Sequence, residues 1–103
     1  MIARFWSARS TPAQARTYVD HLKTKVLATL RKLEGYSRAM LLERQASNEV
    51  EIVVITFWQS LESIRSFAGD DLETAIVADE AADLLTQFDR RVRQYELVVK
   101  DEV

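Results

Sequence analysis

Hydrophobic residues follow two different periods along the chain, and the change of period predicts an order of strands and helices. The short apolar and aromatic run at Ile2–Ala8 is typical of a strand. After it, apolar residues recur three and four positions apart and form one narrow stripe on a helical wheel. The stripe consists of Ala15, Val19, Leu22, Val26, Leu30 and Leu33. This pattern predicts one long helix between residues 12 and 33.

Both ends of that helix carry sequence signals. Thr11 can accept a hydrogen bond from the backbone N–H groups of the first turn, and Pro12 suits the first helical position. Gln14 stands where the second residue of a capping box would reach back to Thr11. Gly35, just beyond the last apolar position, suits the left-handed conformation that ends many helices.

The period shortens in the middle of the chain. Residues 36–44 predict a second strand, which turns at residues 46–49 into a third. The third strand, residues 50–58, is rich in β-branched and aromatic residues and almost continuously apolar. This composition predicts a central strand covered on both faces. Ser60 can begin a shorter helix that ends at Gly69.

Residues 70–87 leave their structure open, since Asp71 or Asp79 could each begin a further helical turn. Residues 88–100 alternate well enough to predict a last strand. The order strand, helix, strand, strand, helix, strand is α+β. It is typical of a ferredoxin-like βαββαβ fold, an antiparallel sheet with both helices on one face. We expect a single domain spanning residues 1–103.

The helices of such a fold cover only one face of the sheet. The other face would carry Ile2, Trp6, Met40 and Leu42, or their alternates, depending on the register of the strands. These residues are too apolar to leave in water, because contiguous apolar patches usually mark an interface. We therefore expect a homodimer in which the sheets of two copies pack face to face.

Composition narrows the classes of function. The 103 residues are 48% hydrophobic and 29% charged, and a net charge of −2 argues against a nucleic-acid partner. The absence of Cys excludes disulfides and Cys nucleophiles, and a single His excludes all-His zinc sites. The acidic clusters at residues 70–73 and 79–83 fit helix starts, so no metal site is expected. No apolar run reaches the roughly 18–20 residues of a membrane span, which favours a cytoplasmic location and no membrane partner.

Several segments resemble the antibiotic biosynthesis monooxygenase-like superfamily. They are the strand Ile2–Trp6, the Thr11–Gln14 helix start, the Leu33–Tyr36 turn and the Phe57–Ile64 junction, while Ile64–Asp71 resembles an uncharacterised branch. The resemblance implies a dimeric α/β barrel with a pocket between sheet and helices in each subunit. Members of the superfamily use such pockets for cofactor-free oxygenation of aromatic polyketides, for haem degradation or for the chemistry of signalling molecules. Some have no established activity.

The resemblance also places candidate binding residues. The haem-degrading branch uses an Asn on the first strand and a Trp and a His ten residues apart on the second helix. The matching positions here are Phe5, Phe67 and Val77. Without an imidazole at Val77 there is no axial ligand for iron, so we expect neither haem degradation nor a cofactor. Together with Trp6 and Trp58, these residues would instead wall a pocket for a flat aromatic molecule, although either Trp could simply pack the core.

Cofactor-free oxygenation needs a hydrogen-bond donor near the developing oxyanion of the substrate. Candidates on the expected strands are Arg4, Arg38, Arg91, Arg93 and Tyr95. We take Tyr95 and Arg38 as the catalytic candidates, and the strand register decides whether Arg38 points into the pocket or into the barrel. His21 falls on the side of the helical wheel away from the apolar stripe, so we expect it in solvent.

Two functions remain open from the sequence. The first is a cofactor-independent monooxygenase-like enzyme acting on a small flat apolar or aromatic molecule. The second is a non-catalytic dimeric protein that binds such a molecule on the same scaffold. An RNA-recognition module shares the order of elements, but it needs a Gly-containing aromatic motif on its third strand that residues 50–58 lack.

Overall fold

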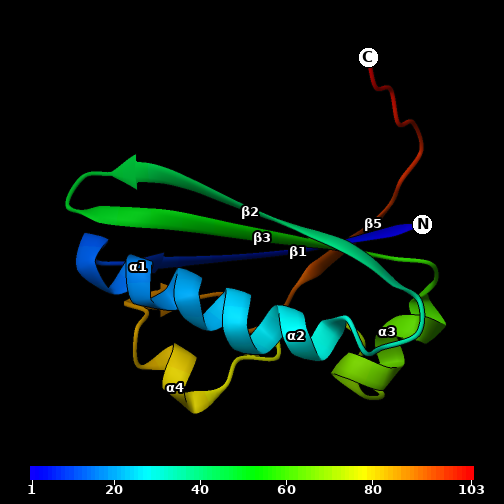
Figure 1. The fold of residues 1–103 in the computed structure, drawn as a ribbon, viewed down its shortest axis with the longest axis horizontal. Helices are drawn as coiled ribbons and strands as arrows, with labels where there is room; N and C mark the ends of the chain where they lie inside the picture. Colours follow the sequence, from blue (N-terminus) through cyan, green and yellow to red (C-terminus); the bar gives the residue numbers. More distant parts are fainter.

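A computed structural model describes all 103 residues as an antiparallel sheet with helices packed against one of its faces (Figure 1). Along the chain the elements are β1 (Ile2–Ser10), α1 (Pro12–His21), η1 (Leu22–Val26), α2 (Leu27–Leu30), β2 (Tyr36–Ala46), β3 (Glu49–Trp58), α3 (Leu61–Ala68), α4 (Asp79–Ala82), β4 (Gln87–Phe88) and β5 (Arg93–Glu96). The α+β ferredoxin-like architecture predicted from the sequence is confirmed.

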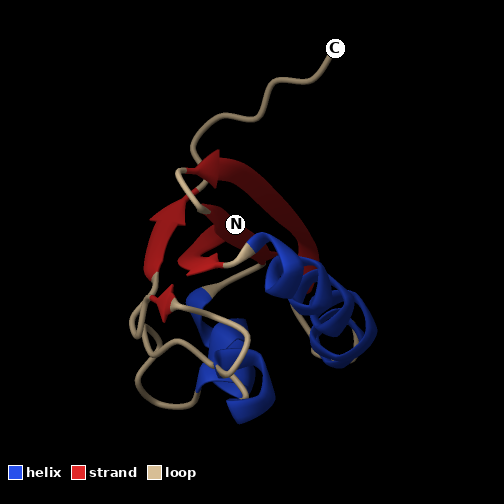
Figure 2. Cartoon of the chain, turned by 90° about the vertical axis from the view of Figure 1, so that its left-hand side faces the viewer, coloured by secondary structure: helices blue, strands red, loops and turns tan.

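The strands are ordered β2-β3-β1-β4 across the sheet, and β5 pairs with β1 as well. Seen from the side, the helices all lie below the sheet and its upper face is free of them (Figure 2). In β1, burial alternates strictly, with Ile2, Arg4 and Trp6 buried and Phe5 half-exposed between them. The even-numbered residues of this strand therefore face the helices.

The register settles which residues occupy the open face of the sheet. Phe5 pairs with Ile55, and Ile55 pairs with Met40 on the other side, so these three share one cross-strand row. Met40 is 42% exposed and Leu42, two residues further along β2, is 52% exposed. Met40 and Leu42 thus lie on the open face as first expected, whereas Ile2 and Trp6 face the helices. Their alternates Ala3 and Phe5 lie on the open face instead.

The first helix is continuous from Pro12 to Leu30 but is not a regular α-helix throughout, because η1 is a π-helical segment between α1 and α2. Its beginning follows the prediction, since Oγ1 of Thr11 accepts a hydrogen bond of 3.2 Å from the backbone N–H of Gln14. It ends one turn earlier than Leu33 because the chain already turns there towards Gly35, whose φ is +87°.

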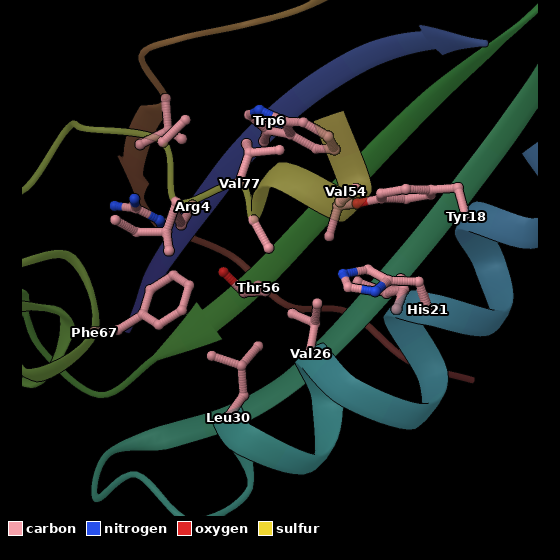
Figure 3. Close-up of a pocket in the computed structure, with 16 residues that line it drawn as sticks. Arg4, Trp6, Tyr18, His21, Val26, Leu30, Val54, Thr56, Phe67 and Val77 are labelled. Carbon is pink, nitrogen blue, oxygen red and sulfur yellow. The ribbon is translucent and has the colours of Figure 1, made fainter. Parts of the chain in front are cut away.

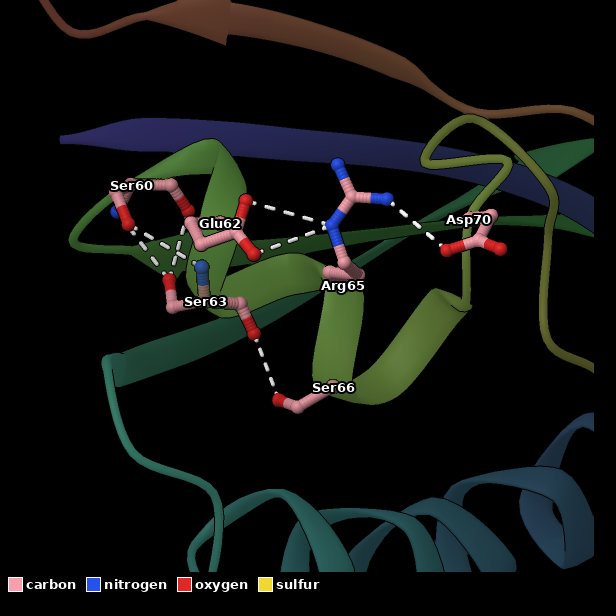
Figure 4. Close-up of polar contacts among 6 residues, drawn as sticks. All are labelled: Ser60, Glu62, Ser63, Arg65, Ser66 and Asp70. Atoms are coloured by element: carbon pink, nitrogen blue, oxygen red, sulfur yellow. Dashed lines mark hydrogen bonds and ion pairs between the residues drawn. The ribbon is translucent and has the colours of Figure 1, made fainter.

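The second helix, α3, begins with the predicted cap (Figure 4). Ser60 and Ser63 each accept a hydrogen bond of 3.2 Å from the other's backbone N–H and so form a reciprocal capping box. One turn later, Arg65 bonds to Glu62 and to Asp70 just beyond the helix. These exposed ion pairs lie at the end of α3.

The prediction of one last strand over residues 88–100 is wrong in its extent, because the structure has two short strands, β4 and β5. The residues between them leave the edge of β1 and pair with residues 73–75. Val92 N–H donates to Glu73 O, and Ala75 N–H donates to Arg90 O. Beyond Glu96 the chain leaves the sheet on the side away from the helices (Figure 1), with Val98 85% exposed. No helix combines the length and apolarity needed to span a membrane.

Candidate functional site

A cavity of about 80 Å³ lies between the helix-covered face of the sheet, the first helix and the segment that leads into α4 (Figure 3). Its lining is mainly apolar. The sheet contributes Trp6, Val54 and Thr56, and the helices contribute Tyr18, His21, Val26, Leu30 and Phe67, while Val77 and Ala81 close the side opposite the first helix. With Val92, which also lines it, the cavity is assembled from six separate stretches of the chain.

A second, more open cavity of about 210 Å³ adjoins the first. The outer cavity adds the charged side chains Lys25 and Glu80. The two cavities share His21, Val26, Phe67, Ile76 and Ala78. Together they approach about 300 Å³, the lower end of the range for small-molecule pockets. The arrangement is an apolar chamber with a polar mouth.

Trp6 forms one end of the chamber. Its ring centroid lies 6.0 Å from that of Tyr18 and 6.5 Å from that of Phe88. Its Nε1–H donates a hydrogen bond of 2.8 Å to the carbonyl of Asp89, so the polar atom of the indole is already satisfied. What remains for a ligand is the apolar surface of the ring.

Trp58 supports the opposite end from behind. It is fully buried, and its ring stacks on Phe67 at 5.8 Å. Its Nε1–H donates to Oγ1 of Thr56 at 2.9 Å. Phe67 and Thr56 line the cavity while Trp58 does not, so Trp58 acts by holding both in place.

His21 is the residue that sequence reasoning placed wrongly. Its side chain is 10% exposed and lines both cavities, whereas the helical wheel predicted a position in solvent. Nε2 is fully buried and has no hydrogen-bond partner, and Nδ1 lies 3.9 Å from Oε1 of Glu80. His21 is buried because the α4 segment covers this side of the first helix (Figure 1). The sequence had left the structure of that segment open.

Tyr18 widens the buried side of the same helix by one position. It is 5% exposed, and burial raises the pKa of its hydroxyl to about 12. Because Tyr18 lies three residues before His21, the two rings are neighbours on the helix, 6.2 Å apart. When Tyr18 is included in the buried face of the helical wheel, His21 lies at the edge of that face and not in solvent.

Arg4 is buried on the helix-covered side of the sheet and has no carboxylate partner. Its guanidinium donates to the carbonyls of Leu72 and Thr74, both at 2.5 Å, and to Oε1 of Gln94 at 2.7 Å. Burial lowers the pKa of Arg4 to about 10. Since its donors are directed at residues 72–74, the main effect of Arg4 is to fasten that segment to β1 beside the cavity.

The structure brings together only some of the residues proposed from the sequence. Trp6, Phe67 and Val77 line the cavity, and Trp58 lies directly behind it. Phe5, Arg38 and Tyr95 lie on the opposite, open face of the sheet. There Tyr95, Ala3, Phe57 and Arg38 form one cross-strand row, with the guanidinium of Arg38 4.6 Å from the ring centre of Phe57.

No family model and no curated protein sequence matches the chain. Solved structures do match it over nearly their whole length. A Bacillus cereus protein designated as an antibiotic biosynthesis monooxygenase superposes with a TM-score of 0.72 at 15% identity, covering 100% of this chain and 96% of its own. SnoaB, a cofactor-independent oxygenase from Streptomyces nogalater, gives a TM-score of 0.59 at 14% identity, covering 96% of this chain and 95% of its own.

A third match is the haem-degrader MhuD from Mycobacterium tuberculosis, which was solved with two haems in its active site. It superposes with a TM-score of 0.61 at 17% identity, covering 99% of this chain and all of its own. The chain has the fold of antibiotic biosynthesis monooxygenase structures, so the resemblance read from its sequence is confirmed at the level of fold. Fold alone does not fix the reaction.

Proposed function

We propose that the protein binds a small, flat, largely apolar molecule in the chamber between Trp6 and Phe67. The observation that carries this proposal is a partly open, mainly apolar cavity whose lining includes His21, a nearly buried side chain with an unpartnered nitrogen. Ligand pockets are typically apolar, with a few polar groups that fix the orientation of the ligand. The mouth at Lys25 and Glu80 gives the polar edge of such a molecule a place in water.

The reaction we propose is cofactor-independent oxygenation of this molecule. SnoaB, which has the same fold, is a cofactor-independent oxygenase. In such a reaction the substrate supplies the electrons. For an anthrone, one atom of O2 becomes the new carbonyl oxygen and the other leaves as water with the two hydrogens of the CH2 group. The residues around the cavity would bind and orient the substrate and exclude water from it.

A non-catalytic, ligand-binding role on the same scaffold is the second candidate. It is favoured by the position of the two residues taken as catalytic, because Tyr95 and Arg38 lie across the sheet from the cavity. Oxygen uptake by the wild type separates the two functions, since only the enzyme consumes oxygen. Full turnover in both Tyr95→Phe and Arg38→Ala would show that these two residues take no part in the reaction.

A panel of flat aromatic compounds, comprising anthrones, quinols, flavins and haem, tests the pocket by quenching of Trp fluorescence. We expect saturable quenching by an anthrone or quinol, because Trp6 lines the chamber. Val77→Phe should weaken that binding by about tenfold or more, since the added ring fills a chamber of about 80 Å³. Val98→Phe adds the same ring on the exposed C-terminal segment and should bind like the wild type. Equal affinities of the two variants would contradict the placement of the ligand.

We further propose that two copies pack through their open sheet faces and form a barrel around Phe5, Arg38 and Tyr95. In support, Met40 and Leu42 are exposed on that face, and the exposed Val98 and Val99 lie in the C-terminal segment, which leaves the sheet on the same side (Figure 1). Contiguous apolar surface of this kind is usually covered by a partner.

Analytical ultracentrifugation at micromolar concentration tests the dimer. The wild type should sediment as twice the chain mass of 11.8 kDa. Met40→Glu combined with Leu42→Glu should sediment as a single chain, because it buries two carboxylates at the contact. Glu43→Lys changes charge on the other face of the same strand and should stay dimeric. A monomeric wild type would contradict the proposal.

A further inference from the structure

His21 is the only histidine of the chain, and the chamber and its mouth meet at its ring. Its Nε2 is fully buried and has no partner in the protein. Such atoms are uncommon, because a buried polar group that forms no hydrogen bond destabilises the fold. In Figure 3 the ring extends from the first helix towards the centre of the lining residues. A hydroxyl group on a molecule bound in the chamber would supply the missing partner.

We propose that Nε2 of His21 accepts the proton of an acidic hydroxyl on the bound molecule, so that the pocket selects phenols, hydroquinones or enols over their ethers. The inference rests on the proposed function, since it names the substrate class of the same pocket. In the transfer the O–H bond of the ligand breaks and leaves its electron pair on oxygen, while an N–H bond forms at Nε2. The product is a phenolate paired with an imidazolium, and the step consumes no oxidant.

The surroundings of the ring suit this role. Nδ1 lies 3.9 Å from Oε1 of Glu80, and a carboxylate there favours a proton on Nδ1, which leaves the lone pair of Nε2 free. The same carboxylate stabilises the imidazolium once it forms. Lys25 competes for Glu80, with Nζ 3.5 Å from Oε2. Tyr18 is the other titratable neighbour on the helix, and Arg4 is the charged residue that the sheet contributes to the cavity. Because Glu80 acts on the ligand only through the proton on Nδ1 of His21, it is a positioning residue.

The single histidine makes the first test direct, because its ring signals need no assignment in the NMR spectrum of the untagged protein. Proton–nitrogen correlation spectra identify which ring nitrogen carries the proton. We expect the Nδ1–H form in the free, neutral protein and an imidazolium when 2-hydroxyanthraquinone is bound. The methyl ether of this probe should bind without that change. Glu80→Gln should weaken the preference for Nδ1–H.

The absorbance of the probe tests the transfer itself, because ionisation of its hydroxyl moves the band to longer wavelength. We expect binding to the wild type to raise the ionisation constant of the hydroxyl by about tenfold or more, as charge-assisted hydrogen bonds favour the ionised form. His21→Gln keeps a hydrogen-bonding side chain but takes up no proton, so the bound probe should ionise no more readily than in water, because the apolar chamber disfavours its charged form. Asp20→Asn, exposed on the neighbouring position, should behave as the wild type.

The outcomes separate this inference from the proposed function. If both probes bind and the hydroxyl ionises alike in the wild type and in His21→Gln, the role of His21 is overturned and the pocket stands. If neither probe binds the wild type, both the proposed function and the inference are overturned. If His21→Gln does not fold, the NMR comparison of the wild type with Glu80→Gln decides, and an Nε2–H form in the free wild type would overturn the proposal.

Discussion

Gly35→Ala is expected to lower the free energy of unfolding by about 2–5 kcal/mol, from a left-handed backbone penalty of about 1–2 and an overpacking penalty of about 1–3. The residue has a φ of +87°, and a Cβ built on it would lie 2.3 Å from Cβ of Ser63. Ser63 is held firmly because it forms the capping box of α3 with Ser60. Relieving the contact therefore means displacing the start of the helix. Urea unfolding followed by circular dichroism measures the effect.

Gly69 provides a control without the steric contact. Its φ is +83° and its ψ of −162° lies in a region open essentially to glycine alone, while a Cβ there would meet nothing within 4 Å. Gly69→Ala should therefore lose stability through backbone strain alone, by about 1–3 kcal/mol, and Ser63→Gly should not recover that loss. Adding Ser63→Gly to Gly35→Ala removes the clashing atom and should recover part of the loss. If Ser63→Gly recovered no more stability in Gly35→Ala than in Gly69→Ala, the contact with Ser63 would not matter.

Raising the pH from 10 to 12 is expected to remove about 2 kcal/mol of stability through Tyr18 alone. The whole two-unit shift is worth about 2.7 kcal/mol, at about 1.4 kcal/mol for each pKa unit, and the rest is lost below pH 10 and above pH 12. Burial raises the pKa of Tyr18 from 10.0 to about 12. Above pH 10 the unfolded chain releases this proton while the folded chain keeps it, so rising pH favours unfolding. The contribution is complete below pH 10 and is lost as the pH passes through 12.

Urea unfolding at a series of pH values, with tyrosinate absorbance read in the same samples, measures this dependence. Tyr18→Phe removes the titrating group and keeps the ring, so the fall in stability over this interval should be smaller by that amount. Tyr36 supplies part of the remaining slope, because burial raises the pKa of its hydroxyl as well. Parallel pH profiles for the wild type and Tyr18→Phe would contradict the buried state of the Tyr18 hydroxyl.

Local sequence determined the elements and their boundaries wherever a signal and its partner lie close together in the chain. Thr11 caps the first helix and Ser60 caps α3 because each accepting oxygen is only three residues from its donor. The third strand was equally clear, since β-branched residues favour that backbone regardless of their neighbours. The order of these elements was enough to predict the α+β fold, because few topologies accommodate it.

Only the tertiary structure decided which face each side chain occupies. In β1, Phe5 and Trp6 are both large and aromatic, so the alternation of the strand gave no preference between them. The pairing of Phe5 with Ile55 placed Trp6 in the chamber and Phe5 on the open face. The same alternation places Tyr95 and Arg38 on the open face, away from the chamber.

The position of His21 depended on a segment distant in sequence. The α4 segment, some sixty residues further along the chain, covers the side of the first helix that carries Tyr18 and His21. A helical wheel describes one helix and contains no information about what packs against it. The sequence by itself therefore determined the scaffold, while the chamber and its one buried imidazole exist only because separate segments meet in space, where burial and partnering are decided.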